Sequence, residues 1–435
     1  MPTTRDENGS LLLGGVTLEA LARDARIGTP AYVYDLDAIA AEARRIHAAF
    51  DGAPHEVAYA VKANSAGPIV RTLAREGCGA DVVSGGELLL ALGCGIAPEK
   101  IVFSGVAKSD EEIDRALAAG DTGILAVQVE SVEELLRVDA RARAAARSAR
   151  VALRVNPGVD KDALDTHAHI ATGHDEAKFG VAREDVSAAF SLAHRSKHLE
   201  VVGVSAHVGS QFTSTEAYVA AARALFDVAH AAREKGTKLR YVDTGGGFGI
   251  DYTDGSGGSI ATPADFVRVA RAAQKAAGLD DLPLHIEPGR SLVGAHGVLL
   301  ARVLQSKRTP HQAETPERSW LLIDAGMNDL IRPALYQARH RIVPLSAGRR
   351  APFPVRVVGP VCESSDDFGE HTGLSEAGYV ALLDAGAYGY TMASRYNGRA
   401  MPAEVFLRGG AVVAVSPRKP MEDWVDERLA TGAAV

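Results

Sequence analysis

From residue 37 to about residue 295 the sequence repeats one pattern: a short apolar run, a turn, and then an amphipathic segment. The apolar runs are rich in Val and Ile, and several lack alternation, which is typical of strands buried on both faces. Eight such runs lie at residues 56–62, 80–84, 101–105, 123–129, 151–156, 200–208, 240–244 and 283–287. Eight strands separated by helices predict an α/β fold of the (β/α)8 TIM-type barrel class, with a doubly wound open sheet as the alternative.

The amphipathic segments predict the helices of this barrel. They lie at residues 37–49, 68–77, 86–93, 110–119, 132–147, 184–197, 214–235 and 264–277. Several of them open with a capping-box pattern, a serine or threonine followed three residues later by glutamate. The cap residues of these patterns are Ser84, Ser109, Ser131 and Thr213.

After residue 296 the pattern changes to strand-like runs with few long helices between them. These runs lie at residues 298–304, 319–324, 354–361, 379–384, 403–408 and 411–415. Gly409 and Gly410 separate the last two runs, which is a hairpin signal. We therefore expect two domains: the barrel of residues 37–295, and a mostly antiparallel β domain formed by residues 1–36 and 296–435.

Charge and cysteine content narrow the class of protein. The chain has 47 Lys and Arg against 55 Asp and Glu, a net charge of −8, which argues against nucleic-acid and anionic-membrane partners. Its three cysteines are widely spaced, so neither a disulfide framework nor a zinc ribbon is indicated, and we expect no metal site. The first ten residues do not resemble a signal peptide, and no apolar run reaches the ~20 residues of a spanning helix. We expect a soluble, cytoplasmic protein.

Polar and glycine residues follow the predicted barrel strands at their C-terminal ends, the face where barrel enzymes place their active sites. They are Lys62, Asn64, Asp81, Ser84, Ser104, Gln128, Glu130, Arg154, Asn156, His207, Gly209, Ser210, Asp243, Gly245, Gly246, Gly247, Glu287 and Arg290.

Four of these features each have a chemical and a structural interpretation. Lys62 is either a desolvated nucleophilic amine or a strand-end lysine that reaches solvent. The glycines at 245–247 cradle a phosphate or form a plain tight turn. Glu287 and Arg290 hold a ring nitrogen and a carboxylate, or pair with each other. His207 is a base, a ligand, a stacked ring or a core histidine. Taken together, the chemical interpretations indicate pyridoxal phosphate.

Four segments, AYAVKAN, SAHVGSQ, DTGGGFGI and EPGRSLV, resemble the signature segments of barrel-type pyridoxal-phosphate decarboxylases, the group IV enzymes with the alanine-racemase-like fold. Three others are similar to the branch of this family that converts meso-diaminopimelate to L-lysine: IDAGMNDLIRPALYQARH, VVGPVCESSDDF and THAHIATGHDEAKFG. The resemblance covers about residues 30 to 400. Ala168-His169 departs from it, since a more Pro-Tyr-like pair is expected there.

The resemblance implies a role for each matching residue. Lys62 would bind pyridoxal 5'-phosphate covalently, His207 would stack on its ring, and Glu287 would pair with its pyridine nitrogen. The other cofactor-binding residues would be Asp81, Arg154, Ser210, Gly245, Gly246, Gly247, Gly289, Arg290 and Tyr388. The small-molecule amino-acid substrate would contact Arg290, Arg332, Tyr336, Glu363 and Tyr388. Cys362 would donate a proton. In the family Cys362 and Glu363 come from the neighbouring subunit, which implies a homodimer with shared active sites.

Other interpretations stay open from the sequence. A relative that decarboxylates ornithine, arginine, D-lysine, carboxynorspermidine or a carrier-bound substrate is one alternative. An amino-acid racemase is another, although racemases of this fold usually pair the ring nitrogen with arginine rather than glutamate. A non-catalytic cofactor-binding protein is the third. At single positions, Cys362 can be a small buried residue, Arg332 a surface arginine and Tyr388 a core ring.

Overall fold

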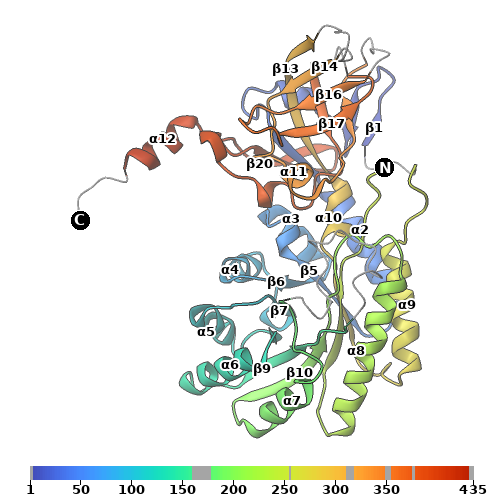
Figure 1. The fold of residues 1–435 in the computed structure, drawn as a ribbon, viewed down its shortest axis with the longest axis vertical. Helices are drawn as coiled ribbons and strands as arrows, with labels where there is room; N and C mark the ends of the chain where they lie inside the picture. Colours follow the sequence, from blue (N-terminus) through green and yellow to red (C-terminus); the bar gives the residue numbers. More distant parts are fainter. Residues whose placement is uncertain are drawn as a thin grey trace. The chain divides into compact units, whose positions relative to one another are not determined.

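The structure, a computed structural model, describes residues 3–158, 178–253, 256–309, 318–347, 354–374 and 378–430. The chain divides into two compact units, coloured along the chain in Figure 1. The barrel unit contains residues 40–251 and 257–292, and the β unit contains residues 1–39, 252–256 and 293–435. Each unit has its own sheet and its own hydrophobic core.

The barrel unit is a closed barrel of eight parallel strands. In chain order they are β5 (His55–Ala60), β6 (Gly79–Val82), β7 (Ile101–Phe103), β8 (Ala126–Val129), β9 (Ala149–Arg154), β10 (Leu199–Ser205), β11 (Tyr241–Gly246) and β12 (Leu284–Glu287). Each strand pairs with the next one in the chain, and β12 pairs with β5 through Leu284 opposite His55, which closes the ring. The predicted (β/α)8 barrel is confirmed, and the alternative of an open sheet is wrong.

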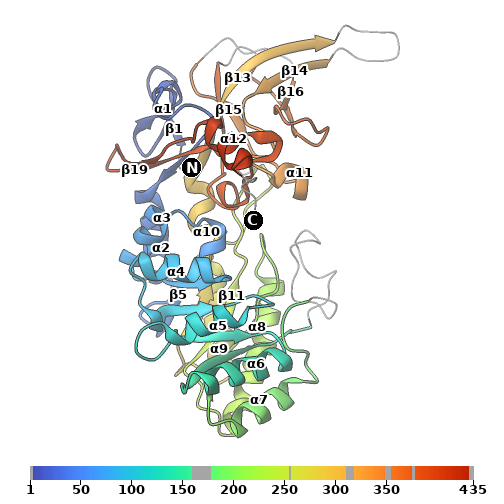
Figure 2. The same cartoon turned by 90° about the vertical axis from the view of Figure 1, so that its left-hand side faces the viewer.

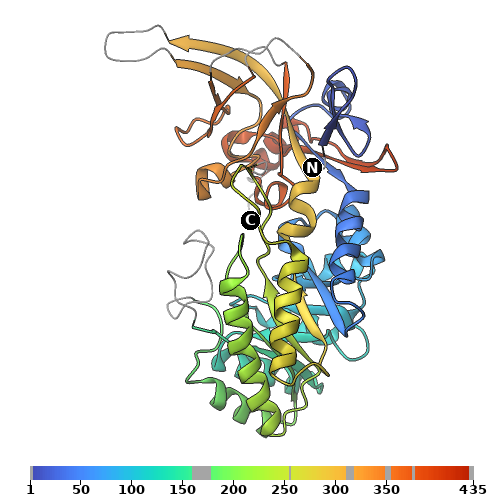
Figure 3. The ribbon, with the colours of Figure 1, turned by 90° about the vertical axis from the view of Figure 1, so that its right-hand side faces the viewer.

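Helices alternate with the strands. They are α2 (Leu36–Ala48), α3 (Gly67–Arg75), α4 (Gly85–Gly93), α5 (Asp110–Ala118), α6 (Val132–Ala144), α7 (Val186–Arg195), α8 (Glu216–Glu234) and α9 (Pro263–Ala276). Figure 2 shows α4, α5, α6 and α7 following one another around one side of the barrel. Figure 3 shows α8 and α9 packed side by side. Among the described residues, no helix combines the length and the apolar character that crossing a bilayer requires.

Side-chain caps fix where several of these helices begin. Ser84, Ser109 and Ser131 each accept a hydrogen bond from the backbone N–H three residues on, as their sequence pattern predicts. The prediction for Thr213 is wrong, because α8 begins two residues later than that pattern requires, and no side chain caps it. The sequence pattern does not predict the capping box of α9, built on Thr262, because its partner is aspartate rather than glutamate.

The β unit is built on one sheet of nine strands, and the predicted antiparallel character is confirmed. Its strands are β4 (Ala31–Asp35), β13 (Gly297–Thr309), β14 (Arg318–Ile323), β15 (Ile342–Pro344), β16 (Val355–Val358), β17 (Asp367–His371), β18 (Tyr379–Leu382), β19 (Ala403–Arg408) and β20 (Ala411–Ser416). A smaller sheet joins β1 (Thr3–Arg5), β2 (Leu11–Leu13) and β3 (Val16–Thr17). The helices α1 (Leu18–Arg23), α11 (Arg332–Tyr336) and α12 (Met421–Leu429) belong to this unit.

Strand β4 is the main element that the sequence pattern does not predict. It lies inside the large sheet, antiparallel to β13 and parallel to β19, and all five of its residues are buried. Its partners lie more than 260 residues later in the chain. A five-residue strand whose partners are this distant leaves no local hairpin or repeat signal.

Candidate active site

Lys62 lies just beyond the first barrel strand. The sequence pattern extends that strand to residue 62, but β5 ends at Ala60 and Lys62 lies in a 3-10 turn, Val61–Ala63. Its Nζ forms an ion pair with Oδ2 of Asp81. Asp81 lies in the neighbouring strand β6 and is fully buried. Burial raises the pKa of Asp81, but the charge and hydrogen bond of Lys62, together with Ser104 and His207, leave that pKa below its usual value. The side chain of Lys62 is 34% exposed, so its amine is held by a carboxylate yet remains accessible.

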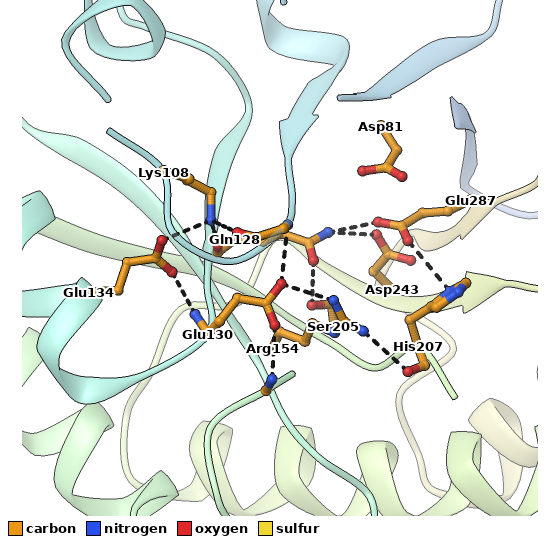
Figure 4. Close-up of polar contacts among 12 residues, drawn as sticks. Asp81, Lys108, Gln128, Glu130, Glu134, Arg154, Ser205, His207, Asp243 and Glu287 are labelled. Atoms are coloured by element: carbon orange, nitrogen blue, oxygen red, sulfur yellow. Dashed lines mark hydrogen bonds and ion pairs between the residues drawn. The ribbon is translucent and has the colours of Figure 1, made fainter. Parts of the chain in front are cut away.

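Two buried carboxyl groups lie close together: Glu287 is the last residue of β12, and Asp243 lies within β11. Their common neighbour is Gln128, whose Nε2 donates to Oε1 of Glu287 at 2.8 Å and lies 3.4 Å from Oδ2 of Asp243 (Figure 4). Burial raises the pKa of Asp243 to about 7. Burial, together with the charges of Asp243 and Asp81, raises the pKa of Glu287 well above its usual value.

His207 lies beside Glu287, with 4.0 Å between its Nδ1 and Oε2 of the carboxyl group. The same Nδ1 accepts a hydrogen bond from the backbone N–H of Gly246 at 3.2 Å. Burial, with the positive charges of Arg154 and Lys62, lowers the pKa of His207 to about 3. The imidazole is therefore neutral at physiological pH, and its contact with Glu287 is not an ion pair.

The glycine run at residues 245–247, which begins inside β11, packs closely against neighbouring backbone. A Cβ on Gly246 would lie 2.0 Å from the carbonyl oxygen of Glu287, and a Cβ on Gly247 would lie 2.2 Å from that of Gly209. Gly245 and Gly247 also have φ values of +69° and +90°. Glycine meets both requirements, the close approach of another backbone and the left-handed φ, so residues 245–247 form a cradle of bare backbone.

Two arginines lie close to the cradle. Arg290 donates from Nη2 to the Ser210 hydroxyl at 3.1 Å. Arg154 donates to Oε1 of Glu130 at 2.9 Å and to the His207 carbonyl oxygen at 3.3 Å. Figure 4 shows Arg154 between Glu130 and His207. These contacts tie the loop after β10 to the ends of β8 and β9.

The β unit holds the remaining candidate residues. Arg332 is buried, with 5% of its surface exposed, so its interpretation as a surface arginine is wrong. Its Nη1 is 2.7 Å from Nε2 of His340, and its guanidinium lies over the ring of Tyr252. Tyr336 ends the same short helix, α11, and is half-buried. Tyr388 is half-buried and has a left-handed φ of +55°.

Cys362 and Glu363 lie in a turn between β16 and β17. Cys362 is exposed, so it is not the small buried residue of the structural interpretation. Its backbone N–H donates to Oδ1 of Asn397 at 2.9 Å, and the hydroxyl of Tyr396 donates to Oε1 of Glu363 at 2.6 Å. Cys362 and Glu363 are therefore exposed to solvent and are held by hydrogen bonds with the turn that contains Tyr396 and Asn397.

Three positioning side chains have no role in the sequence interpretation: Gln128, Tyr396 and Asn397. The sequence places Gln128 among the polar residues at the strand ends without giving it a role, whereas nothing in the local sequence marks the other two. The THAHIATGHDEAKFG segment falls largely on residues 166–177, including the departure at Ala168-His169, which lie outside the described residues.

Comparison with known proteins places this geometry in a family. Residues 36–294 match the pyridoxal binding domain of the pyridoxal-dependent decarboxylases. Over 97% of the chain and 98% of the relative, the sequence is 40% identical to diaminopimelate decarboxylase of Pseudomonas aeruginosa. The relative from Aquifex aeolicus is 36% identical over 98% of both chains. The chain belongs to the diaminopimelate decarboxylases.

Solved structures of diaminopimelate decarboxylases agree with this assignment. The Helicobacter pylori enzyme, complexed with L-lysine, has a TM-score of 0.86 and 36% identity, and covers 95% of this chain and 100% of its own. The M. jannaschii enzyme, also complexed with L-lysine, has a TM-score of 0.89 and 34% identity. The match covers 98% of this chain and 97% of that enzyme.

Diaminopimelate decarboxylases use pyridoxal 5'-phosphate, and the residues of the barrel unit fit this cofactor. The cradle at residues 245–247 has no side chains, so a phosphate can approach its backbone closely. Lys62 offers an accessible amine. Glu287 offers a buried carboxyl group, which can partner a protonated ring nitrogen. An aromatic imidazole, His207, lies next to it.

Proposed function

We propose that this chain removes carbon dioxide from meso-diaminopimelate and forms L-lysine. The observation that carries the proposal is the extent of the match: relatives of this activity align with nearly the whole chain, including the β unit with its candidate substrate residues. The two complexes with L-lysine are of enzymes similar to this chain, and lysine is the product expected here. An amino-acid decarboxylase rather than a racemase also agrees with a glutamate, Glu287, among the buried barrel residues.

Pyridoxal phosphate, when bound, supplies the electron sink that makes loss of a carboxylate from Cα feasible. Lys62 would hold the cofactor through its amine. Glu287 would hold a proton at the pyridine nitrogen, and the glycine cradle with Ser210 would bind the phosphate. His207, which is neutral, would stack on the ring without adding positive charge.

The substrate's ends would be recognised by charge. Arg290, Arg332 and Tyr336 would bind its carboxylates, and Tyr388 would contribute to both cofactor and substrate binding. Glu363 would bind the distal ammonium, and Cys362 would donate the proton to Cα. In this proposal the cofactor-binding domain comprises residues 37–295, and the β domain of residues 1–36 and 296–435 supplies substrate and interface residues.

A substrate panel tests the proposal. The purified enzyme, supplied with pyridoxal phosphate, is incubated with meso-diaminopimelate, ornithine, arginine, D-lysine and carboxynorspermidine, and carbon dioxide release and chiral amino-acid analysis are recorded. We expect release from meso-diaminopimelate with equimolar L-lysine. Faster release from another member of the panel, or interconversion of stereoisomers without carbon dioxide, would contradict the proposal.

We further propose a cytoplasmic homodimer in which Cys362 and Glu363 act in the active site of the partner subunit. The cytoplasm agrees with three cysteines that are all free thiols. The dimer agrees with an exposed Cys362-Glu363 turn, which lies at the surface of its own β unit.

Mixing two inactive proteins tests the shared site. Lys62→Ala and Cys362→Ala proteins are each inactive, but a mixed dimer rebuilds one intact site. We expect up to about a quarter of wild-type activity after random exchange of subunits. If exchange is shown by mass spectrometry and no activity returns, then both residues act within one chain.

A further inference from the structure

Gln128 occupies a central place in the barrel that the proposed function leaves without a role. It lies in β8, is 2% exposed, and its side chain points into the barrel interior between two carboxyl groups (Figure 4). Its Nε2 is 2.8 Å from Oε1 of Glu287 and 3.4 Å from Oδ2 of Asp243. One amide nitrogen has two hydrogens, so it can serve both carboxyl groups at once.

The orientation of this amide is fixed from its other side. The hydroxyl of Ser205, from β10, donates to Oε1 of Gln128 at 2.9 Å. Lys108 donates from Nζ to the backbone carbonyl of Gln128 at 2.6 Å, and is itself buried. Both ends of the residue are therefore held, and its Nε2 must face Glu287 and Asp243.

The second oxygens of the two carboxyl groups have separate neighbours. Oδ1 of Asp243 accepts from the backbone N–H of Gly245 at 2.8 Å, which links it to the glycine cradle. Oε2 of Glu287 faces Nδ1 of His207. With Oε1 held by Gln128, the carboxyl group of Glu287 cannot rotate freely, and Oε2 stays on the side of the imidazole.

The charges around this pair do not allow both carboxyl groups to ionise easily. The other titratable groups that face them from neighbouring elements are Lys62, Asp81, Arg154, His207, Tyr218 and Tyr241. Of the two cations, Lys62 is paired with Asp81 and Arg154 with Glu130. His207 is neutral. Asp243 also hydrogen-bonds Glu287 directly, and the neutral amide of Gln128 is a partner of both acids. Two like charges so placed disfavour each other.

We propose that Gln128 is a positioning residue for Glu287: its amide joins Glu287 and Asp243 into a pair that holds one proton, and directs Oε2 of Glu287 towards His207. The proposal rests on the proposed function in one respect, the role of Glu287 beside the pyridine nitrogen. An amide suits this task because it orients the acid without a charge, whereas a lysine or arginine would hold both acids ionised.

The test is a pH titration of the cofactor-free enzyme, in which the infrared absorption of protonated carboxyl groups is measured. Asp243→Asn and Glu287→Gln assign the component that belongs to the pair, since both should abolish or shift it. Gln128→Met keeps the volume and removes the donor. Because a hydrogen bond to a carboxylate favours its ionised form, we expect this variant to move the midpoint of the pair upward by about one pH unit.

Gln274 provides a matched control. It is also fully buried, and its Nε2 also donates to two oxygens, the carbonyls of Leu279 and Leu282, at 3.0 and 2.9 Å. Gln274→Met should lower the melting temperature as a lost buried amide does, yet leave the titration unchanged. If Gln128→Met does not fold, Gln128→Asn serves instead, because its shorter side chain cannot reach both acids.

Three outcomes would overturn the proposal: an unchanged midpoint in the Gln128 variant, an equal shift in Gln274→Met, or a component unaffected by Asp243→Asn and Glu287→Gln. The readout contains neither substrate nor cofactor, so it is independent of the proposed reaction. A shifted midpoint in an enzyme that does not release lysine would disprove the proposed function and leave the role of Gln128 intact.

Discussion

At the residue scale, Lys62 is the group on which the proposed cofactor site depends. Borohydride reduction of the enzyme with pyridoxal phosphate should attach the cofactor irreversibly to Lys62, because its amine is accessible and lies beside a buried carboxylate. Peptide mapping by mass spectrometry identifies the modified lysine. Lys108 is the internal comparison, since it is a buried lysine in the same barrel whose Nζ already bonds two carbonyl oxygens. Modification at Lys108, or at any residue other than Lys62, would refute the assignment of the site.

At the scale of elements, substitution of a glycine in the loop after β11 should cost more stability than substitution of a glycine elsewhere that has the same backbone conformation. Gly247 and Gly236 have φ values of +90° and +88°, but a Cβ on Gly236 meets nothing within 4 Å. Gly236→Ala should therefore lower the free energy of unfolding by about 1 kcal/mol, the cost of a left-handed backbone. Gly247→Ala should lower it by a further ~1–3 kcal/mol, because its Cβ overlaps a carbonyl oxygen.

Denaturant unfolding of the two alanine variants measures this difference. The affinity for pyridoxal phosphate gives a second comparison, and we expect it to fall in Gly247→Ala and to stay at the wild-type value in Gly236→Ala. Equal losses of stability and affinity in the two variants would show that the close backbone packing at Gly247 contributes nothing to cofactor binding.

At the scale of the whole molecule, buried acids should make stability depend on pH. Burial raises the pKa of Glu404 in the β unit to about 7, and the hydroxyl of Tyr34 contacts its carboxyl group at 3.2 Å. A raised folded-state pKa means that the folded protein keeps a proton that the unfolded chain loses near pH 4.5. The stabilisation from Glu404 is therefore complete below about pH 4.5 and is lost as pH rises through about 7.

Glu404→Gln should remove the part of the pH dependence of stability that comes from Glu404. Between pH 5 and 7 the free energy of unfolding should fall less steeply with pH in the variant than in the wild type. The two slopes should differ by about 1 kcal/mol per pH unit. Chemical denaturation of the cofactor-free protein at several pH values measures both slopes. Parallel curves would mean that Glu404 is already ionised in the folded protein.

The sequence by itself determined the barrel and the face at which the candidate site residues lie. Eight apolar runs with helices between them predict parallel strands, and parallel strands must end at one face, so the sequence predicts that Lys62, His207 and Glu287 lie near that face. These features are local in the chain, because periodicity and turn residues act over a few positions. The resemblance of several segments then added the roles.

Only the tertiary structure decided which side chains meet. Gln128 and Glu287 are 159 residues apart, and their contact depends on barrel closure and on the register of every strand between them. The position of β4 in the large sheet is likewise set by distant partners. Local patterns do not encode such contacts, because the free energy that selects them comes from packing the whole chain.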